Sequence, residues 1–142
     1  MMRQSGFTLL EVLVAILVLS IGLLGLAGLM ASSIRNNHSA QQRTQATWLA
    51  YDVIDRMRVN RPAAIASSDN YNVAFGAASV SADLAGADIT DWKATLSNAL
   101  PAGDGAVTVD SVTREVTVII QWNDSRGTGG SNAQQLQVET QL

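Results

Sequence analysis

One carboxylate stands at the start of a long apolar stretch near the N-terminus. Glu11 directly precedes Val12–Ile34, a run of 23 residues without a charge. A carboxylate placed near the middle of a bilayer costs about 2.5–3.5 kcal/mol on insertion scales. A nearby cation would offset this cost, because charge pairs are much stronger in a low dielectric than in water. The sequence therefore predicts that Glu11 either meets a cation or lies at the headgroup boundary.

The apolar run itself is long enough to cross a membrane. As a helix, Val12–Ile34 would span roughly 34 Å, which exceeds the hydrocarbon core of a bilayer. A soluble core helix is rarely apolar on every face. A secretory signal peptide would have a shorter apolar region ending in a small-residue cleavage site, and no clear site of that kind is present. A plain membrane anchor and a helix used for assembly both remain open.

The residues around Glu11 favour the assembly interpretation. Gly6-Phe7-Thr8-Leu9-Leu10-Glu11 resembles the processing motif of type IV prepilins and related pseudopilins. The resemblance implies that a prepilin peptidase in the inner membrane cleaves between Gly6 and Phe7. The leader, residues 1–6 with Arg3, would stay in the cytoplasm, and the new amine of Phe7 would be methylated. That amine could then pair with Glu11 of its own or a neighbouring chain, so that Glu11 marks the register in which a subunit docks.

Three glycines recur every third residue within the apolar run. Gly22, Gly25 and Gly28 would let membrane helices approach closely. Glycine also weakens a helix by about 1 kcal/mol per site relative to alanine. The segment is therefore a candidate for helix packing or, as the resemblance implies, for a stretch that loosens when the subunit enters a filament.

The pattern becomes amphipathic beyond the apolar run. Leu49, Val53 and Met57 recur at helical spacing, and polar residues fill the other side. Arg61-Pro62 predicts a helix stop, because proline disfavours α geometry in the residue before it. We expect one helix from Phe7 to near Asn60. Its first part, residues 7–34, would be the transmembrane and assembly half, and residues 35–61 the amphipathic stem half.

The remaining residues, 62–142, are expected to form a globular head. Ala63–Ala87 predicts a loop with one short strand near Tyr71–Phe75. Thr90 is a candidate cap for a helix over Asp91–Leu100. Period-2 alternation predicts strands at three places, Val107–Asp110, Val116–Trp122 and Leu136–Leu142. The predicted fold class is α+β and type IV pilin-like, with a long N-terminal membrane and stem helix packed on a small antiparallel sheet.

A narrower resemblance extends into the head. Asp52–Pro62 and the run Asp91-Trp92-Lys93 through Leu100-Pro101 resemble PilV-type minor pilins, the type IV pilus modification proteins. The resemblance implies a low-abundance subunit that primes pilus assembly, with other minor pilins, the major pilin and the inner-membrane assembly platform as partners. Before assembly it would lie in the lipid bilayer as a single-pass inner-membrane protein, its head in the periplasm of a Gram-negative-type bacterium. It would then join the pilus at or near the tip and serve twitching motility or cell adhesion.

One departure from the pilin pattern concerns the C-terminal loop. Many pilins close that loop with a disulfide, and this chain has no cysteine. The Gly-rich loop Asn123–Ala133 must therefore be held by hydrogen bonds or by a partner, or remain mobile.

Composition weakens the case for other functions. Residues 1–61 carry six cations against three acids, and residues 62–142 carry three cations against nine acids. The acidic outer half argues against nucleic acid as the main ligand. No general acid–base pair or nucleophile is apparent around the single histidine, His38, so no enzyme activity, catalytic residue, metal or cofactor is expected.

Three further groups of residues are expected to have structural rather than ligand-binding roles. We expect Trp48, Trp92 and Trp122 to be core residues. Asp83, Asp88 and Asp91 match no EF-hand spacing. The arginines at the end of the stem should pair with nearby acids, and they are Arg56, Arg58 and Arg61.

Three functions remain in competition at this stage. A minor pilin of a type IV pilus is the leading interpretation. A minor pseudopilin of a type II secretion system shares the same N-terminal chemistry. A membrane-tethered binding module or adhesin would need a distinct patch on the head.

Overall fold

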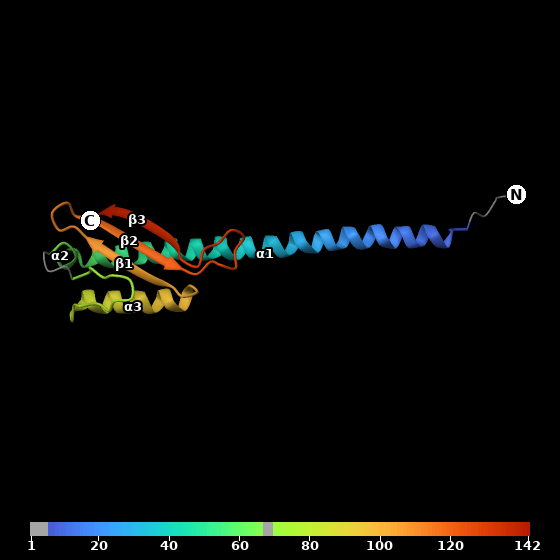
Figure 1. The fold of residues 1–142 in the computed structure, drawn as a ribbon. Coiled ribbons are helices and arrows are strands. Elements are labelled where there is room, and N and C mark those ends of the chain that lie inside the picture. The colour runs from blue at the N-terminus through green and yellow to red at the C-terminus, as the bar shows by residue number, and fades with distance from the viewer. Residues whose placement is uncertain (1–5, 67–69) are drawn as a thin grey trace.

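The chain forms a long helical rod with a small head along its C-terminal half (Figure 1). The structure, a computed structural model, describes residues 6–66 and 70–142. The chain order of the elements is α1 (Leu9–Val59), α2 (Arg61–Ala64), α3 (Leu84–Ala99), β1 (Asp104–Val109), β2 (Glu115–Trp122) and β3 (Gln134–Gln141). The predicted α+β, pilin-like layout is confirmed.

The N-terminal half of α1 is not covered by any other described part of the chain. Figure 1 shows it projecting well beyond the head. Its most apolar window has a mean hydropathy of 2.8 and is 0% buried. Within the described residues it is the one helix long and apolar enough to cross a membrane. Since so much apolar surface is unfavourable in water, this half is suited to serve as a membrane anchor.

The C-terminal half of α1 carries the core stripe that the sequence predicts. Its buried residues recur at helical spacing: Ala46, Ala50, Val53, Ile54 and Met57. Trp48 is instead 70% exposed, so its predicted core position is wrong. Each residue of an α-helix turns about 100° from the last, which places position 48 roughly opposite positions 46 and 50.

The sheet supplies the opposite wall of the core. Its order is β1-β2-β3, and both pairs are antiparallel, as expected. Alternate residues of β2 are buried, and they are Val116, Val118, Ile120 and Trp122. The expected apolar faces of the three strands are confirmed, although Leu136 and Val138 of β3 are only partly buried.

Helix α3 fills the remaining side of the core and starts earlier than predicted. Asp83, not Thr90, caps it, because the Asp83 carboxylate accepts from the amides of Ala85 and Gly86. Thr90 lies inside the helix and donates to the carbonyl of Gly86 at 2.7 Å. Trp92 is fully buried, and its indole Nε1 donates to the carbonyl of Leu49 in α1 at 2.8 Å. This hydrogen bond ties α3 to the stem.

Two further expectations need correction. No strand forms near Tyr71–Phe75, where the pairing is limited to a single bridge between Val73 and Val107. The predicted helix stop at Arg61-Pro62 is also incomplete, because a short second helix, α2, contains Pro62. This proline lies in the first turn of α2, where its missing amide removes no hydrogen bond and its fixed φ favours the helix.

A polar cluster joins the end of the stem to the head. The hydroxyl of Tyr71 donates to Asp88 at 2.6 Å and accepts from Asn60 at 3.1 Å. Burial, followed by the hydrogen bond to Asp88, raises the pKa of Tyr71 to about 12. Arg56 lies 3.7 Å from Asp88 and 3.0 Å from Asp52. The expected pairing with nearby acids is confirmed for Arg56 and for Arg58, which contacts Asp55 at 2.9 Å. It is wrong for Arg61, which instead donates to the carbonyl of Leu142 at 3.0 Å and pairs with no acidic side chain among the described residues.

Hydrogen bonds, not a disulfide, hold the Asn123–Ala133 loop. The hydroxyl of Ser39 in α1 donates to the carboxylate of Asp124 at 2.5 Å. The amide of Asp124 donates to the carbonyl of Ser131 at 2.8 Å, which closes the loop on itself. Asp124 is only 3% exposed. Of the alternatives set out for this loop, hydrogen bonding is therefore the one that the structure contains.

Candidate processing and assembly site

The predicted cleavage site lies in exposed, extended chain. Gly6, Phe7 and Thr8 precede α1 and have no regular structure. Thr8 is extended, with φ −80° and ψ 150°, and the side chain of Phe7 is 85% exposed. Exposed chain outside secondary structure is the form in which a peptidase can reach a peptide bond. The Gly6–Phe7 bond is therefore accessible, and cleavage and methylation there stay predictions. The leader residues 1–5 lie outside the described part of the chain.

Glu11 occupies the first turn of α1, and this placement gives it a second role. The amide of Glu11 donates to Thr8, at 3.3 Å from the side-chain hydroxyl and 3.1 Å from the carbonyl. Thr8 is thus the N-cap and Glu11 the N3 residue, the spacing of a capping box. A carboxylate in the first turn also interacts favourably with the helix dipole, by about 0.3–1 kcal/mol at an exposed site. The Thr-x-x-Glu spacing is visible in the sequence and could have revealed this cap.

The surroundings of Glu11 are almost entirely apolar. A shallow hollow of about 460 Å³ lies beside it, and its lining is Phe7, Glu11, Val12, Ala15, Ile16 and Leu19. Phe7 and Glu11 therefore share one surface at the start of the helix. Because an apolar environment strengthens charge pairing, an amine at position 7 would be well placed to neutralise the carboxylate of its own chain or of a neighbour.

The three glycines lie farther along the same exposed helix. Gly22 is eleven residues from Glu11, or roughly 16 Å along the axis. Helix α1 is continuous through Gly22, Gly25 and Gly28. A Cβ added at any of the three would meet nothing within 4 Å. The small size of these residues is therefore not required by packing against the described residues of this chain, and their roles in helix packing or loosening stay predictions about an assembly.

The remaining sequence signals have local roles. Asp83 caps α3, and Asp88 accepts from Tyr71. His38 is exposed on the stem, as expected. The glycines at 127, 129 and 130 lie in the loop between β2 and β3, as expected. Sequence reasoning missed the Ser39–Asp124 contact, since the two residues are 85 positions apart.

Comparison with known families agrees with this site. A family model described as the prokaryotic N-terminal methylation motif matches residues 1–27. No curated protein matches the chain significantly, and no solved structure does. The motif and the α+β layout together indicate a type IV pilin-like protein of the kind processed as a prepilin. That class of protein is structural rather than enzymatic.

Proposed function

We propose that this protein is a minor pilin of a type IV pilus, of the PilV type, which acts in the initiation of pilus assembly. The observation that carries the proposal is the uncovered apolar half of α1, which begins at an accessible Gly6–Phe7 bond and bears one carboxylate at Glu11. In this proposal prepilin peptidase removes residues 1–6 and Phe7 is methylated. The stem then leaves the bilayer and packs against the stems of other pilins.

The charge at Glu11 has a defined part in this step. In the bilayer the carboxylate lies at the cytoplasmic end of the apolar run, and in a filament it lies among apolar stems. An unpaired charge is costly in such a setting, whereas pairing with the amine of Phe7 offsets the cost. A subunit that docks in the wrong register leaves the carboxylate unpaired. The pairing energy therefore favours one register, which is how a single charge can guide entry.

Three variants separate this role from helix capping. Glu11→Ala removes the charge, Glu11→Gln keeps the size of the side chain, and Thr8→Ala removes the cap without changing the charge. The cap contributes about 0.5–2 kcal/mol to the helix. We expect all three chains to insert into the inner membrane, and only the two Glu11 variants to enter filaments poorly. Equal impairment by Thr8→Ala would show that Glu11 acts through the cap, contrary to the proposal.

Deletion of the gene tests the pilus assignment directly. We expect fewer surface pili by electron microscopy, with recovery when the wild-type chain is restored. Normal piliation together with a defect in protein secretion would contradict the pilus assignment and favour the pseudopilin alternative.

A further inference from the structure

The two edges of the sheet differ in how they are protected. β1 forms one edge and β3 the other, because β2 lies between them. At the β1 edge, the amide and carbonyl of Val107 exchange hydrogen bonds with Val73, each at 2.9 Å. The amide of Val109 also donates to the side chain of Asn72 there, at 2.7 Å. The β3 edge has no such cover among the described residues, so the sheet has one closed edge and one open edge.

The hydrogen-bond register shows which groups of β3 face outward. The amide of Leu142, just after β3, donates to the carbonyl of Arg114, just before β2, and this pair extends the β2–β3 register by one step. In an antiparallel ladder, hydrogen-bonded pairs alternate with non-bonded pairs. Even-numbered residues of β3 therefore bond to β2, and the amides and carbonyls of odd-numbered residues point away from the sheet. These outward residues have no backbone partner among the described residues, and they are Gln135, Gln137, Glu139 and Gln141.

β3 also lacks the features that commonly protect an edge strand. Exposed edges are usually blunted by lysine, proline, a bulge or a covering loop. The sequence of β3 contains no lysine and no proline. Every residue of the strand is paired in register with β2, so the strand has no bulge. An open edge of this kind can accept a further strand through main-chain hydrogen bonds.

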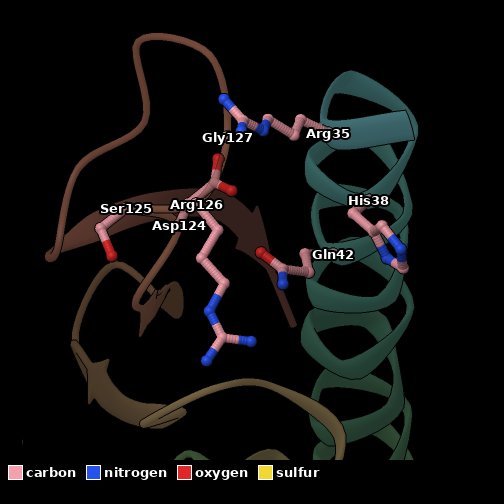
Figure 2. A pocket seen from close by; sticks show the side chains of 7 residues that line it. All are labelled: Arg35, His38, Gln42, Asp124, Ser125, Arg126 and Gly127. Atoms are coloured by element: carbon pink, nitrogen blue, oxygen red, sulfur yellow. The ribbon is translucent and has the colours of Figure 1, made fainter. Parts of the chain in front are cut away.

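β3 is held in place at both ends. At its start, the loop that precedes it is tied to α1 by the hydrogen bond from Ser39 to Asp124. Figure 2 shows that loop beside α1, with Gln42 pointing toward it from the helix. At its end, Gln141 Nε2 donates to the carbonyl of Thr113 at 2.8 Å. A strand fixed in this way loses little conformational entropy when it pairs with another strand.

The side chains on the two faces of β3 restrict what can pair with it. Leu136 and Val138 pack on the core but stay only partly buried, so apolar side chains of an added strand would cover them further. On the other face, Glu139 and Glu115 line a shallow hollow of about 330 Å³. Glu139 accepts from the side chain of Gln137, and neither carboxylate forms an ion pair among the described residues. A lysine or arginine on the added strand would complement these carboxylates.

A second copy of this chain is a poor match for the open edge. Two identical β3 edges would pair antiparallel about a two-fold axis perpendicular to the sheet. Because α1 runs alongside the sheet (Figure 1), this rotation would point the two membrane halves in opposite directions. Two chains anchored from the same side of one membrane do not allow that arrangement.

We infer that the open edge of β3 binds an extended segment of a different subunit of the same assembly, which adds a fourth strand to the three-stranded sheet. That segment alternates apolar side chains, which cover Leu136 and Val138, with polar ones that include a cation beside Glu139. A neighbouring subunit whose stem packs along α1 would bring its head alongside this edge. The choice of partner rests on the proposed function, whereas the open edge itself does not.

The first test measures how a synthetic strand binds to the full chain in detergent micelles. The probe is a labelled peptide as long as β3, in which valine alternates with threonine and lysine, and binding is followed by fluorescence anisotropy. Two further peptides carry N-methyl groups on the backbone amides of one alternate set or of the other. Only one set can face β3, so we expect one methylated peptide to bind about tenfold or more weakly and the other to bind like the probe.

Variants of the chain locate the binding edge. Gln137→Pro removes an outward amide without breaking a hydrogen bond to β2, and its ring obstructs an added strand, so affinity for the probe should fall about tenfold or more. Gln137→Thr keeps the amide and is the matched control, which should bind normally. Glu139→Gln should weaken binding by about 2–5-fold, because an exposed charge pair contributes little. Circular dichroism shows that each variant keeps its fold.

The second test identifies the partner in the host. A photo-crosslinking residue at position Gln137 should join the chain to a different subunit that carries an N-terminal methylation motif. The same residue at position Val80, which is 83% exposed and lies outside the strands, should not. A crosslink to a second copy, a crosslink to a protein without the motif, or no excess over the Val80 control would overturn the choice of partner.

Three results with the peptides would overturn binding at the open edge. They are no binding of the probe, equal binding of all the peptides, or equal losses for Gln137→Pro and Gln137→Thr. The peptide assay needs no pilus, so its failure would leave the proposed function standing. Normal piliation after deletion of the gene would contradict the proposed function without affecting the peptide result.

Discussion

The contact between Ser39 and Asp124 can be measured as a coupling energy between two side chains. The Ser39 hydroxyl donates to the Asp124 carboxylate at 2.5 Å, and Asp124 is 3% exposed. A hydrogen bond to a charged group contributes about 1.5–3 kcal/mol. Asp124→Ala should therefore lower the free energy of unfolding of the head by about 2 kcal/mol. For a domain of this size, that corresponds to a Tm lower by about 8–16 °C.

Ser39→Ala should cost at least as much as Asp124→Ala, because it removes a donor from a buried carboxylate. The double variant should be less destabilised than the sum of the two single variants, by about 1–2 kcal/mol. The assay is thermal unfolding of the full chain in detergent micelles, followed by near-ultraviolet circular dichroism of the buried indoles of Trp92 and Trp122. Ser125→Ala, at an exposed position of the same loop, is the control and should leave Tm unchanged.

If the losses in free energy of unfolding from the two single variants add to that of the double variant within about 0.5 kcal/mol, the reasoning is refuted. The effects of substitutions at independent sites add, whereas those at contacting sites do not. A Tm unchanged by Asp124→Ala would also refute it. Either result would mean that the loop is held without the Ser39–Asp124 hydrogen bond.

Three further predictions concern the head and the membrane helix. Gly105→Ala should destabilise the head by about 1–3 kcal/mol, measured by thermal unfolding, because the added Cβ would lie 2.3 Å from Cη2 of the buried Trp92; an unchanged Tm would contradict this packing. Burial by itself would raise the pKa of Asp104, but the amides of Gly76 and Gly105 and the ammonium of Lys93 outweigh it and lower the pKa. This stabilisation is complete above the unfolded-state pKa and is lost as pH falls through the folded-state pKa. Asp104→Asn should therefore flatten the loss of stability below about pH 4. An unchanged dependence of stability on pH in that acidic range would count against this prediction. Gly25→Ala should not destabilise the isolated chain, since no described atom lies within 4 Å of the added Cβ and alanine favours a helix over glycine, and it should reduce incorporation into filaments in a pull-down of sheared pili; normal incorporation would remove Gly25 from the assembly surface.

The repeating patterns of the sequence predicted most of the fold. Helical spacing located the core stripe of the stem, including Val53 and Met57, and alternation located the buried face of β2. The start of α3 was missed because the residues after Asp83 are small: Ala85, Gly86 and Ala87 carry little periodic signal. The large apolar side chain of Trp48 favours a core position, but its helical phase places it roughly opposite the buried Ala46 and Ala50.

The candidate sites also differ in whether a local sequence pattern reveals them. Gly6, Phe7 and Glu11 are close in sequence, so a local motif was enough to identify them. The open edge of β3 depends on which strands pair with one another, and no local pattern of residues sets that order. Asp124 lacks any local pattern for the same reason, because its partner Ser39 lies 85 residues away.

The mature N-terminus tests the central claim most directly. Intact and peptide mass spectrometry of the chain purified from membranes of its own host should find a first residue of Phe7 carrying an added methyl group on its amine. A chain that retains Met1–Gly6, or that begins elsewhere, would contradict the processing on which the pairing with Glu11 depends.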